Sequence, residues 1–410
     1  IYDADCSPQA LFEEHCAWSR RFAPPPSPAP AGFSGRRNAL GRLRIGYVSP
    51  DFRRHPVTAL FLPVLERHDC EAVETHCYYN FPAHDALTER VKRAAGHWHD
   101  IFGLTDEQVA ARIREDRIDI LVDLAGHTTH GRLLAFAHKP APVQISWLGY
   151  FHSTGLPAMD YFVTDPHSSP GGQERYFVER LVRLPVTRFC YQPLEIMPEP
   201  NALPAIGRGS ITFGSFNNLA KLNGRVLALW SDILKAVSNS RLIVQALAFN
   251  DASTRERFAA TLGQCGIPRE RVELRPYVPI ERSPYAYHDI DIALDPFPFC
   301  GGMTSLESLW MGVPVVTLSQ EILAGRQTES MLANLGLTEW VARSPERYIE
   351  IAMALAQDQD RLAELRRTLR ARFAASPLAD AVSFTRHLEA AYQAIWTESI
   401  KGLDSDANVI

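Results

Sequence analysis

Hydrophobic and polar positions follow two different periods along most of the chain. From Leu43 onward, short apolar runs such as "LRIGYVS" and "DILVDLA" alternate with segments such as "ALTERVKRA", whose apolar residues recur every three or four positions. Short apolar runs are typical of buried strands, and the longer period is typical of amphipathic helices. Their alternation predicts a parallel sheet with helices on both faces.

This alternation pauses once and then restarts. Residues 183–210 hold five prolines and show no clean period, which is typical of a domain boundary. Beyond them, strands are predicted over "ITFGSFN", "RLIVQAL", "VELRPY", "DIDIALD" and "PVVTL". We therefore predict an α/β protein with two Rossmann-like domains facing across a cleft, at residues 43–190 and 209–383, joined by a linker at 191–208.

The two ends of the chain have a different character. Residues 8–23 predict one helix, with an apolar face made of Leu11, Phe12, Cys16 and Phe22. The proline-rich stretch that follows predicts an extended linker. We assign residues 1–42 to this helical segment and linker, and residues 384–410 to a C-terminal helix and tail.

Composition narrows the class of protein. The 410 residues are 46% hydrophobic and 22% charged, so the chain can bury two or three domain cores. The net charge of −5 argues against a nucleic-acid or anionic membrane surface, and no apolar run approaches the roughly 20 residues of a membrane span. The seven cysteines are scattered without a Cys-x-x-Cys pair, so we expect a reduced, cytoplasmic protein without a disulfide framework or zinc site.

The stretch "DPFPFCGGMTSLESLW" at 295–310 has two glycines in the turn between a predicted buried strand and a predicted helix. Free backbone N–H groups and the positive end of the helix dipole converge at such a turn, which makes it a candidate anion site. Thr304 and Glu307 are equally consistent with a plain capping box that binds nothing. From the residues alone, both interpretations stay open.

Other polar candidates follow other predicted strands. His55 follows the first strand, where it could act as a base or hold a pyrophosphate or hydroxyl, although position alone favours a cap for the helix that starts at Pro56. His127 follows a later strand, and His130 and His138 are placed on the helix after it. Lys221 follows the first strand of the second half and could neutralise a diphosphate, the alternative being an exposed loop lysine.

Several chemistries are disfavoured. No grouping of histidine, aspartate or cysteine has metal-ligand spacing, and "HWHD" at 97–100 predicts a strand fragment with alternating faces, so we expect no metal site. The Asp-x-Asp at 289–291 begins a buried strand and is discounted as a metal motif. There is no Gly-x-Gly-x-x-Gly fingerprint after a strand and no Walker A motif, which disfavours a nicotinamide-dependent dehydrogenase.

Four segments carry a resemblance to a known family. The segments "VSPDFRRHP", "KPAPVQISWLGYFHSTGLPAMDYFVTD", "FGSFNNLAKL" and "DIALDPFPFCGGMTSLESLWMGVPVVTL" resemble the catalytic region of O-linked N-acetylglucosamine transferases, in particular bacterial homologues. The resemblance implies a GT-B fold and metal-independent, inverting transfer from UDP-N-acetylglucosamine or a related UDP-sugar to a protein, with no cofactor. It also implies tetratricopeptide repeats before the catalytic part, to which the helix at 8–23 would be the junction.

The resemblance also implies residue roles. His55 matches the family's active-site histidine, Asp116 an aspartate proposed as a base, and Lys221 the lysine on the UDP diphosphate. The donor-binding positions that the resemblance implies are Asn218, Lys221, Tyr277, Val278, Gly301, Gly302, Met303, Thr304 and Glu307. Among them, Gly301–Thr304 would hold the diphosphate, Glu307 the ribose, and the backbone at Tyr277 and Val278 the uracil.

Four positions depart from the family's pattern. Gly302 and Met303 replace a histidine and a threonine of animal members, and Ile280 and Ser283 replace a lysine and a histidine near the nucleotide. Our leading prediction is transfer of N-acetylglucosamine to Ser or Thr hydroxyls, with His55, His127 or Asp116 orienting the acceptor or taking its proton. Two alternatives stay open: a UDP-hexose transferase directed at Asn or a glycan, and a nucleotide-sugar-binding scaffold without catalysis.

Overall fold

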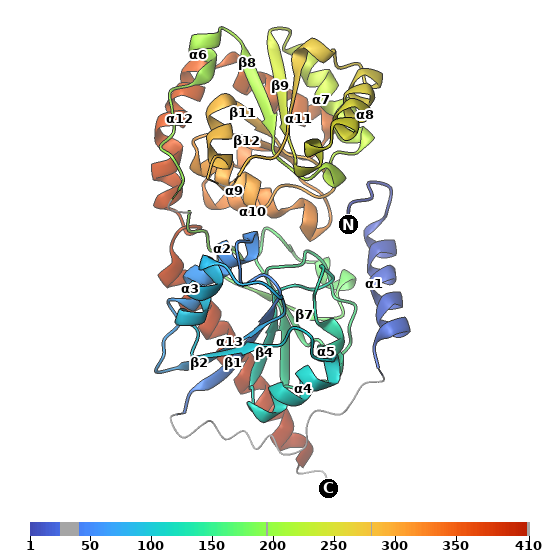
Figure 1. The fold of residues 1–410 in the computed structure, drawn as a ribbon, viewed down its shortest axis with the longest axis vertical. Helices are drawn as coiled ribbons and strands as arrows, with labels where there is room; N and C mark the ends of the chain where they lie inside the picture. Colours follow the sequence, from blue (N-terminus) through green and yellow to red (C-terminus); the bar gives the residue numbers. More distant parts are fainter. Residues whose placement is uncertain (25–40, 194–195, 280, 408–410) are drawn as a thin grey trace. The chain divides into compact units, whose positions relative to one another are not determined.

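The computed structural model describes residues 1–24, 41–193, 196–279 and 281–407. The chain divides into two compact units. The N-terminal unit comprises Ser7–Gln192 with Asp380–Ile410, and the C-terminal unit comprises Ile1–Cys6 with Pro193–Ala379 (Figure 1). Each unit is built around its own parallel sheet, as the alternating pattern predicts.

The sheet of the N-terminal unit has seven strands in the order β3-β2-β1-β4-β5-β6-β7, and every pairing is parallel. The strands are β1 (Leu43–Ser49), β2 (Val73–Tyr79), β3 (His97–Asp100), β4 (Ile120–Asp123), β5 (Val143–Ser146), β6 (Tyr161–Thr164) and β7 (Arg180–Arg183). The helices of this unit are α1 (Pro8–Phe22), α2 (Pro56–Leu65), α3 (Ala86–Ala94), α4 (Asp106–Glu115), α5 (Leu133–Ala137), the 3₁₀ turn η1 (Gln173–Tyr176) and α13 (Ala381–Ala407).

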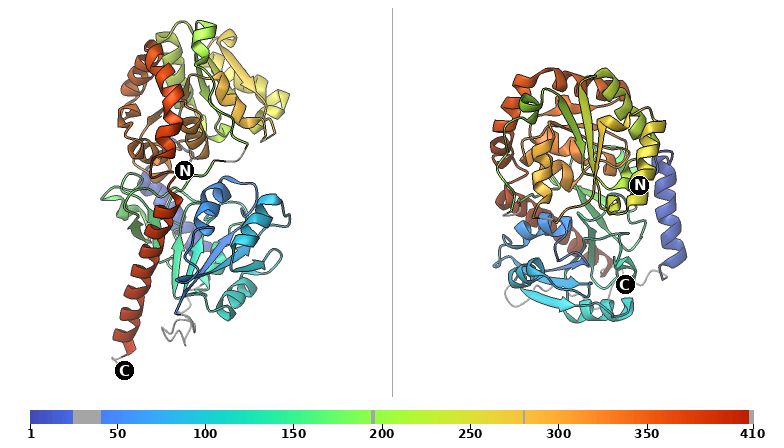
Figure 2. Two further views of the ribbon diagram at one scale, coloured as in Figure 1. Left: turned by 90° about the vertical axis from the view of Figure 1, so that its left-hand side faces the viewer. Right: turned by 45° about the horizontal axis from the view of Figure 1, so that its top comes forward.

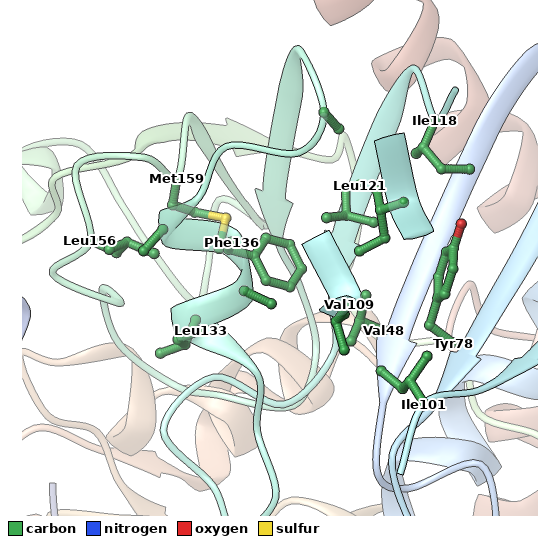
Figure 3. Close-up of a cluster of buried hydrophobic side chains, with 14 residues drawn as sticks. Val48, Tyr78, Ile101, Val109, Ile118, Leu121, Leu133, Phe136, Leu156 and Met159 are labelled. Atoms are coloured by element: carbon green, nitrogen blue, oxygen red, sulfur yellow. The ribbon is translucent and has the colours of Figure 1, made fainter. Parts of the chain in front are cut away.

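One face of this sheet packs against α4 and α5. Val48 of β1, Tyr78 of β2 and Leu121 of β4 meet Val109 of α4 and Phe136 of α5 in one buried cluster (Figure 3). All are fully or almost fully shielded from solvent. This cluster supplies much of the hydrophobic free energy that holds the two helices on the sheet.

The sheet of the C-terminal unit has six parallel strands in the order β10-β9-β8-β11-β12-β13. The strands are β8 (Ile211–Ser215), β9 (Ser240–Gln245), β10 (Val272–Arg275), β11 (Ile292–Leu294), β12 (Val315–Leu318) and β13 (Val341–Ala342). The α-helices are α6 (Pro204–Arg208), α7 (Gly224–Ala236), α8 (Ala252–Gln264), α9 (Met303–Trp310), α10 (Gln327–Asn334), α11 (Pro345–Gln357) and α12 (Gln359–Ala374). Short 3₁₀ turns include η2 (Leu219–Lys221) and η5 (Ser283–Asp289).

The structure differs from the predicted organisation at both ends of the chain. Helix α1 forms as predicted, but its buried face is Leu11, His15 and Ser19, while Phe22 is exposed. The predicted C-terminal helix is α13, and it belongs to the N-terminal unit (Figure 2). The proline-rich linker lies mostly outside the described residues.

Helix α13 is held to the N-terminal sheet by polar as well as apolar contacts. The Glu389 carboxylate of α13 lies 2.9 Å from Nδ1 of His68, and the hydroxyl of Tyr392 lies 3.5 Å from that of Tyr47 in β1. More than 300 residues separate these partners along the chain, so no local pattern could assign α13 to this unit. None of the described helices has the length and apolarity that crossing a bilayer requires.

We expect Phe136→Ala to lower the free energy of unfolding by about 3–5 kcal/mol, because it leaves a cavity between α5 and the sheet. Urea unfolding of the two purified chains would measure the difference. Val382→Ala is the control, since Val382 is 57% exposed on α13, and it should change the free energy by no more than about 0.5 kcal/mol. Equal effects of the two substitutions would contradict this account of the core.

Candidate active site

Strand order shows where each sheet can bind a ligand. The chain turns back between β1 and β4 in the first sheet and between β8 and β11 in the second. Ligands of open parallel sheets bind beyond the carboxyl ends of the strands at such switch points. His55 follows β1 and His127 follows β4, while Lys221 follows β8 and the glycine turn at 301–304 follows β11. Each sheet therefore presents its candidate residues at its own switch point.

The turn after β11 is shaped by Gly301. A Cβ atom built on Gly301 would lie 2.1 Å from Ser305 Oγ and 2.8 Å from Asp295 Oδ1, so no side chain fits there. The Gly301 N–H donates to Asp295 Oδ1 at 2.5 Å, and Thr317 Oγ1 donates to the other carboxylate oxygen at 2.8 Å. Burial raises the pKa of Asp295. The buried carboxylate thus fixes the turn against β11 and β12.

The start of α9 is open to an anion. Its N-cap is Gly302, and no side chain among the described residues caps it. Of the two interpretations left open, the capping box does not form: Thr304 lies inside the helix, and its Oγ1 donates to Asn217 Oδ1 at 3.2 Å. Uncapped N–H groups at a helix start, together with the helix dipole, favour a phosphate or carboxylate.

Lys221 lies directly against this turn. Its Nζ donates to the carbonyl oxygen of Cys300 at 2.7 Å and lies 3.9 Å from the centroid of the Phe299 ring. Burial lowers the pKa of Lys221, although nearby Asp295 acts in the opposite direction. The structure therefore brings together two features that lie 80 positions apart in the sequence, and Lys221 is not an exposed loop lysine.

Glu307 and Tyr287 form a pair beside the same helix. The Tyr287 hydroxyl lies 3.0 Å from Glu307 Oε2 and 3.1 Å from the carbonyl oxygen of Thr304, so it can donate to either. Burial raises the pKa of Glu307 to about 7, although the tyrosine hydrogen bond acts to lower it. Tyr287 was not among the predicted residues, because it lies in the 3₁₀ turn η5 with no motif around it.

The remaining residues predicted to bind the donor differ in their exposure and in their contacts. Asn218 is exposed and caps η2 by accepting from Ala220 N, whereas its buried neighbour Asn217 contacts Thr304 of the glycine turn. Tyr277 is 44% exposed, and its N–H donates to Asn250 Oδ1 at 3.0 Å. Val278 follows it in the same exposed segment. Asn217 is thus closer than Asn218 to the candidate anion site.

His55 is positioned as a hydrogen-bond donor. Its Nδ1 accepts from Val57 N at 3.2 Å and so caps α2, as position alone favours. Burial lowers the pKa of His55 to about 4, with Arg53 acting in the same direction. A neutral ring whose Nδ1 accepts must carry its proton on Nε2. The outward nitrogen of His55 can therefore donate, but in this tautomer it cannot take a proton.

His127 is positioned in the opposite way. Its Nε2 lies 2.8 Å from the carbonyl oxygen of Thr154, which can only accept, so the proton of the neutral ring is on Nε2. Burial lowers the pKa of His127. Its Nδ1 then carries the lone pair, and the backbone carbonyl orients the ring much as a carboxylate orients a catalytic histidine.

A cavity of about 500 Å³ in the N-terminal unit is lined by His127. Trp18 of α1 packs edge-on against His127 with ring centroids 4.5 Å apart, and it lines the same cavity. Asn80, His130 and Arg132 supply polar groups around it. The predicted place of His130 is wrong, since α5 starts only at Leu133. The cavity thus combines His127 with apolar and hydrogen-bonding residues, as is typical of a substrate pocket.

Asp116 lies elsewhere. It is the C-cap of α4 and precedes β4, whereas His127 follows the carboxyl end of that strand. Its Oδ2 accepts from the Tyr78 hydroxyl at 2.8 Å and from Arg112 Nε at 3.2 Å. The structure therefore does not bring Asp116 together with His55 and His127.

Comparison with known proteins identifies the family. The model of glycosyl transferase family 41 matches residues 29–199 and 201–388. The chain belongs to this family. Its two Rossmann-like units are those of a GT-B glycosyltransferase fold, as the resemblance implies.

Relatives of the family 41 chain are similar over nearly its whole length. It is 40% identical over 397 residues to "Probable UDP-N-acetylglucosamine--peptide N-acetylglucosaminyltransferase SPINDLY" of Solanum lycopersicum, covering 96% of this chain and 42% of that protein. It is 33% identical to the protein of the same enzyme name called SEC in Arabidopsis thaliana, covering 95% of this chain and 41% of that protein. The chain thus spans less than half the length of these curated relatives.

Solved structures show the same relationship. A variant O-GlcNAc transferase of Thermobaculum terrenum is 42% identical with a TM-score of 0.91, covering 98% of this chain and 76% of that chain. An Anabaena protein solved with UDP is 10% identical with a TM-score of 0.53, covering 86% of this chain and 100% of that chain, and it shows a likeness of fold alone.

Two of the four departures from the family's pattern can be placed at the glycine turn. Gly302 differs from Gly301 because a Cβ there would lie 3.4 Å from Gln327 Oε1, a contact that a small shift would relieve. Met303 is the first residue of α9. Ser283 begins η5, and Ile280 lies outside the described residues. The space at Gly302 would thus accept a side chain, whereas the space at Gly301 would not.

Glu307 makes the stability of this family 41 chain depend on pH. The pKa of Glu307 is about 7 in the fold and ordinarily 4.5, so folding favours the protonated acid. Its contribution is fully present below pH 4.5 and is lost as pH rises through about 7. We expect the free energy of unfolding, relative to Glu307→Gln, to fall across that interval in urea titrations. Glu350→Gln, at an exposed site on α11, should leave the pH slope unchanged; a parallel loss of slope in both variants would contradict the assignment.

Proposed function

We propose that this chain carries the catalytic region of a UDP-N-acetylglucosamine–protein O-glycosyltransferase. The enzyme names of the SPINDLY and SEC relatives and of the Thermobaculum protein support this activity. The observation that carries the proposal is Lys221 Nζ beside the uncapped, glycine-lined start of α9, at the switch point of the second sheet. A cation and free N–H groups at one place suit the diphosphate of a nucleotide sugar.

The donor would lie on the C-terminal unit. In this proposal the diphosphate rests on the backbone of Gly301–Thr304, with hydrogen bonds from N–H groups because Gly302 and Met303 bring no donor side chain. Glu307, paired with Tyr287, accepts from the ribose hydroxyls. The backbone at Tyr277 and Val278, on an exposed segment, would hold the uracil. Asn218 stays a weaker candidate than Asn217 for contact with the diphosphate turn.

Lys221 would act on the leaving group. As the bond between the anomeric carbon and the UDP oxygen breaks, negative charge grows on the diphosphate, and a fixed ammonium lowers the energy of that transition state. The partial burial of Lys221 strengthens this interaction because less water screens it. No metal ion is needed for this step in the proposed mechanism.

The N-terminal unit would supply the acceptor chemistry. The Ser or Thr oxygen attacks the anomeric carbon opposite the departing UDP, which inverts the configuration, and its proton passes to Nδ1 of His127. His55 would instead donate from Nε2 to a substrate oxygen, because its Nδ1 is held by Val57 N. Asp116 is not part of this mechanism. The linkage to Ser or Thr, rather than Asn, is tested by release of the sugar in alkaline β-elimination.

Three further properties remain predictions from the sequence: a bacterial source, a cytoplasmic location and attached tetratricopeptide repeats. The identity of the acceptor protein is a separate question, and transfer to a peptide library would address it.

Lys221→Ala should lower the rate of sugar transfer from UDP-N-acetylglucosamine by roughly 10²–10³-fold, since it removes charge from the leaving group. Transfer of radiolabelled sugar to a peptide pool measures this rate. Lys235→Ala is the matched control, because Lys235 lies on α7 with its side chain 62% exposed. A near-normal rate for Lys221→Ala would refute the assigned role.

His127→Asn should lower the maximal transfer rate by roughly 10²–10⁴-fold, as expected when a general base is lost. In the unmodified chain the rate should fall on the acid side at a pH below 6.5, because burial lowers the pKa of His127 from that value. That acid limb should disappear in the variant. His130→Asn is the control: it lines the same cavity and has φ of 62°, which asparagine tolerates. Retention of the acid limb in His127→Asn would assign the base elsewhere.

A further inference from the structure

Three histidines gather on the outer strands of the N-terminal sheet, where His99 Nε2 lies 3.5 Å from Asp116 Oδ2. In the register of β2 and β3, His76 pairs with His97 and Tyr78 pairs with His99. The His76 and His97 rings stack with centroids 4.2 Å apart, and His76 and His99 stack at 5.5 Å. Side chains two apart on a strand share a face, so all three histidines project from one side of the sheet.

A carboxylate completes the group. Glu74 precedes His76 by two residues on the same face of β2, and its Oε1 lies 3.4 Å from His76 Nε2 and 3.2 Å from His97 Nε2. Ligands bound to zinc at about 2.0–2.1 Å in a tetrahedron lie about 3.3–3.4 Å from one another. The two distances from Glu74 Oε1 therefore match edges of a tetrahedral site, and all three atoms lie within 4.8 Å of one another.

The charges around Glu74 leave one oxygen facing the histidines. Arg42 and Arg44 lie 3.6 and 3.9 Å from Glu74 Oε2, the other oxygen. Oε1 is the atom that faces His76 and His97. The arginines thus place positive charge on the Oε2 side of the carboxylate, and the histidines lie on the Oε1 side.

An unsatisfied nitrogen points to a missing partner. His76 is 5% exposed, and its buried Nε2 lies 3.4 Å from Glu74 Oε1 but makes no hydrogen bond of regular geometry with any described residue. Its Nδ1 lies 3.3 Å from His99 Nε2. A buried polar atom without a hydrogen bond is costly. A cation beside His76 Nε2 and Glu74 Oε1 would give that nitrogen a ligand bond.

The outer residues fit the surroundings of such an ion. With a metal on Nε2, His76 carries its proton on Nδ1 and donates to His99 Nε2, the usual hydrogen bond of a metal-bound histidine. This arrangement moves the proton of His99 to Nδ1, which in the metal-free chain accepts from Arg112 at 3.3 Å. Arg112 has a side chain 49% exposed and also bonds Asp116, so it can turn away from His99 and keep that contact.

We propose that Glu74 Oε1, His76 Nε2 and His97 Nε2 bind a divalent transition-metal ion of the zinc class, with water as the fourth ligand. Imidazole and carboxylate ligands in a tetrahedral set favour zinc over magnesium or calcium. The ion ties the edge strand β3 to β2. It lies on the β2–β3 edge rather than at the switch point between β1 and β4, so its role is structural and it takes no part in sugar transfer.

The sequence did not reveal this group of ligands, because they have no metal-ligand spacing along the chain. Glu74 and His76 come from one strand and His97 from the next, and parallel pairing sets His97 opposite His76. Along the chain, Glu74 with His76 and His97 with His99 are two separate pairs. The register of the sheet places them side by side.

Calorimetric titration of the full chain, stripped with a chelator, with ZnCl₂ tests the proposal. We expect one ion per chain, together with a rise in the thermal unfolding temperature. His97→Ala and Glu74→Gln should abolish the stoichiometric binding and the temperature rise. The His97 side chain is 51% exposed, so its variant should fold, and circular dichroism would confirm that it does. His387→Ala, an exposed histidine on α13, should bind as the unmodified chain does.

Two further measurements distinguish zinc binding at this site from zinc binding by other groups of the chain. Cys6 and Cys70 are exposed thiols that could also bind zinc, so Co²⁺ loading should give a tetrahedral spectrum without thiolate charge-transfer absorption. His99→Gln should weaken binding by about 10–100-fold, as loss of an outer hydrogen bond does. The proposal is overturned by a thiolate spectrum, by unchanged binding in His97→Ala, or by the absence of stoichiometric zinc binding to the unmodified chain.

Discussion

The architecture of the donor-side region depends on the lack of space around Gly301. Asp295, Thr304 and Ser305 close in on its Cα so tightly that no side chain fits. In the turn that Gly301 allows, the Cys300 carbonyl oxygen accepts from Lys221, and α9 starts without a side-chain cap. The buried carboxylate of Asp295 stabilises this arrangement by accepting a hydrogen bond from the Gly301 N–H. Close approach of backbone to a ligand is a recurrent use of glycine.

The two histidines at the first switch point show how backbone contacts decide chemistry. His55 and His127 are both partly buried, and burial lowers the pKa of each. They differ in which ring nitrogen the backbone contacts: an N–H group donates to Nδ1 of His55, and a carbonyl oxygen lies against Nε2 of His127. One ring is left as a donor and the other as an acceptor. A residue type alone therefore says little about whether a histidine acts as a base.

Burial of ionisable groups at the donor-side site has a cost in free energy. Glu307, Asp295 and Lys221 all lose water around their charged forms, and each recovers part of that cost through a specific hydrogen bond. Such arrangements favour function over stability, because apolar residues of the same volume at these positions would give a more stable fold. Ionisable groups with shifted pKa values at the carboxyl end of a strand are typical of a binding site.

Local periodicity predicted most of the strands and helices, the two α/β units and the glycine turn, because these depend on residues adjacent in the chain. It did not predict β6, β7 and β13, which are only two to four residues long. The sequence by itself also determined which family the chain resembles. Only the tertiary structure decided that α13 completes the N-terminal unit, that Asp116 lies apart from His127, that Asn217 rather than Asn218 meets the glycine turn, and that His76 and His97 lie together. Those outcomes depend on strand order and register, which are set by packing between residues far apart in the chain. Periodicity shows which face of an element is buried, but it does not show which partner buries it.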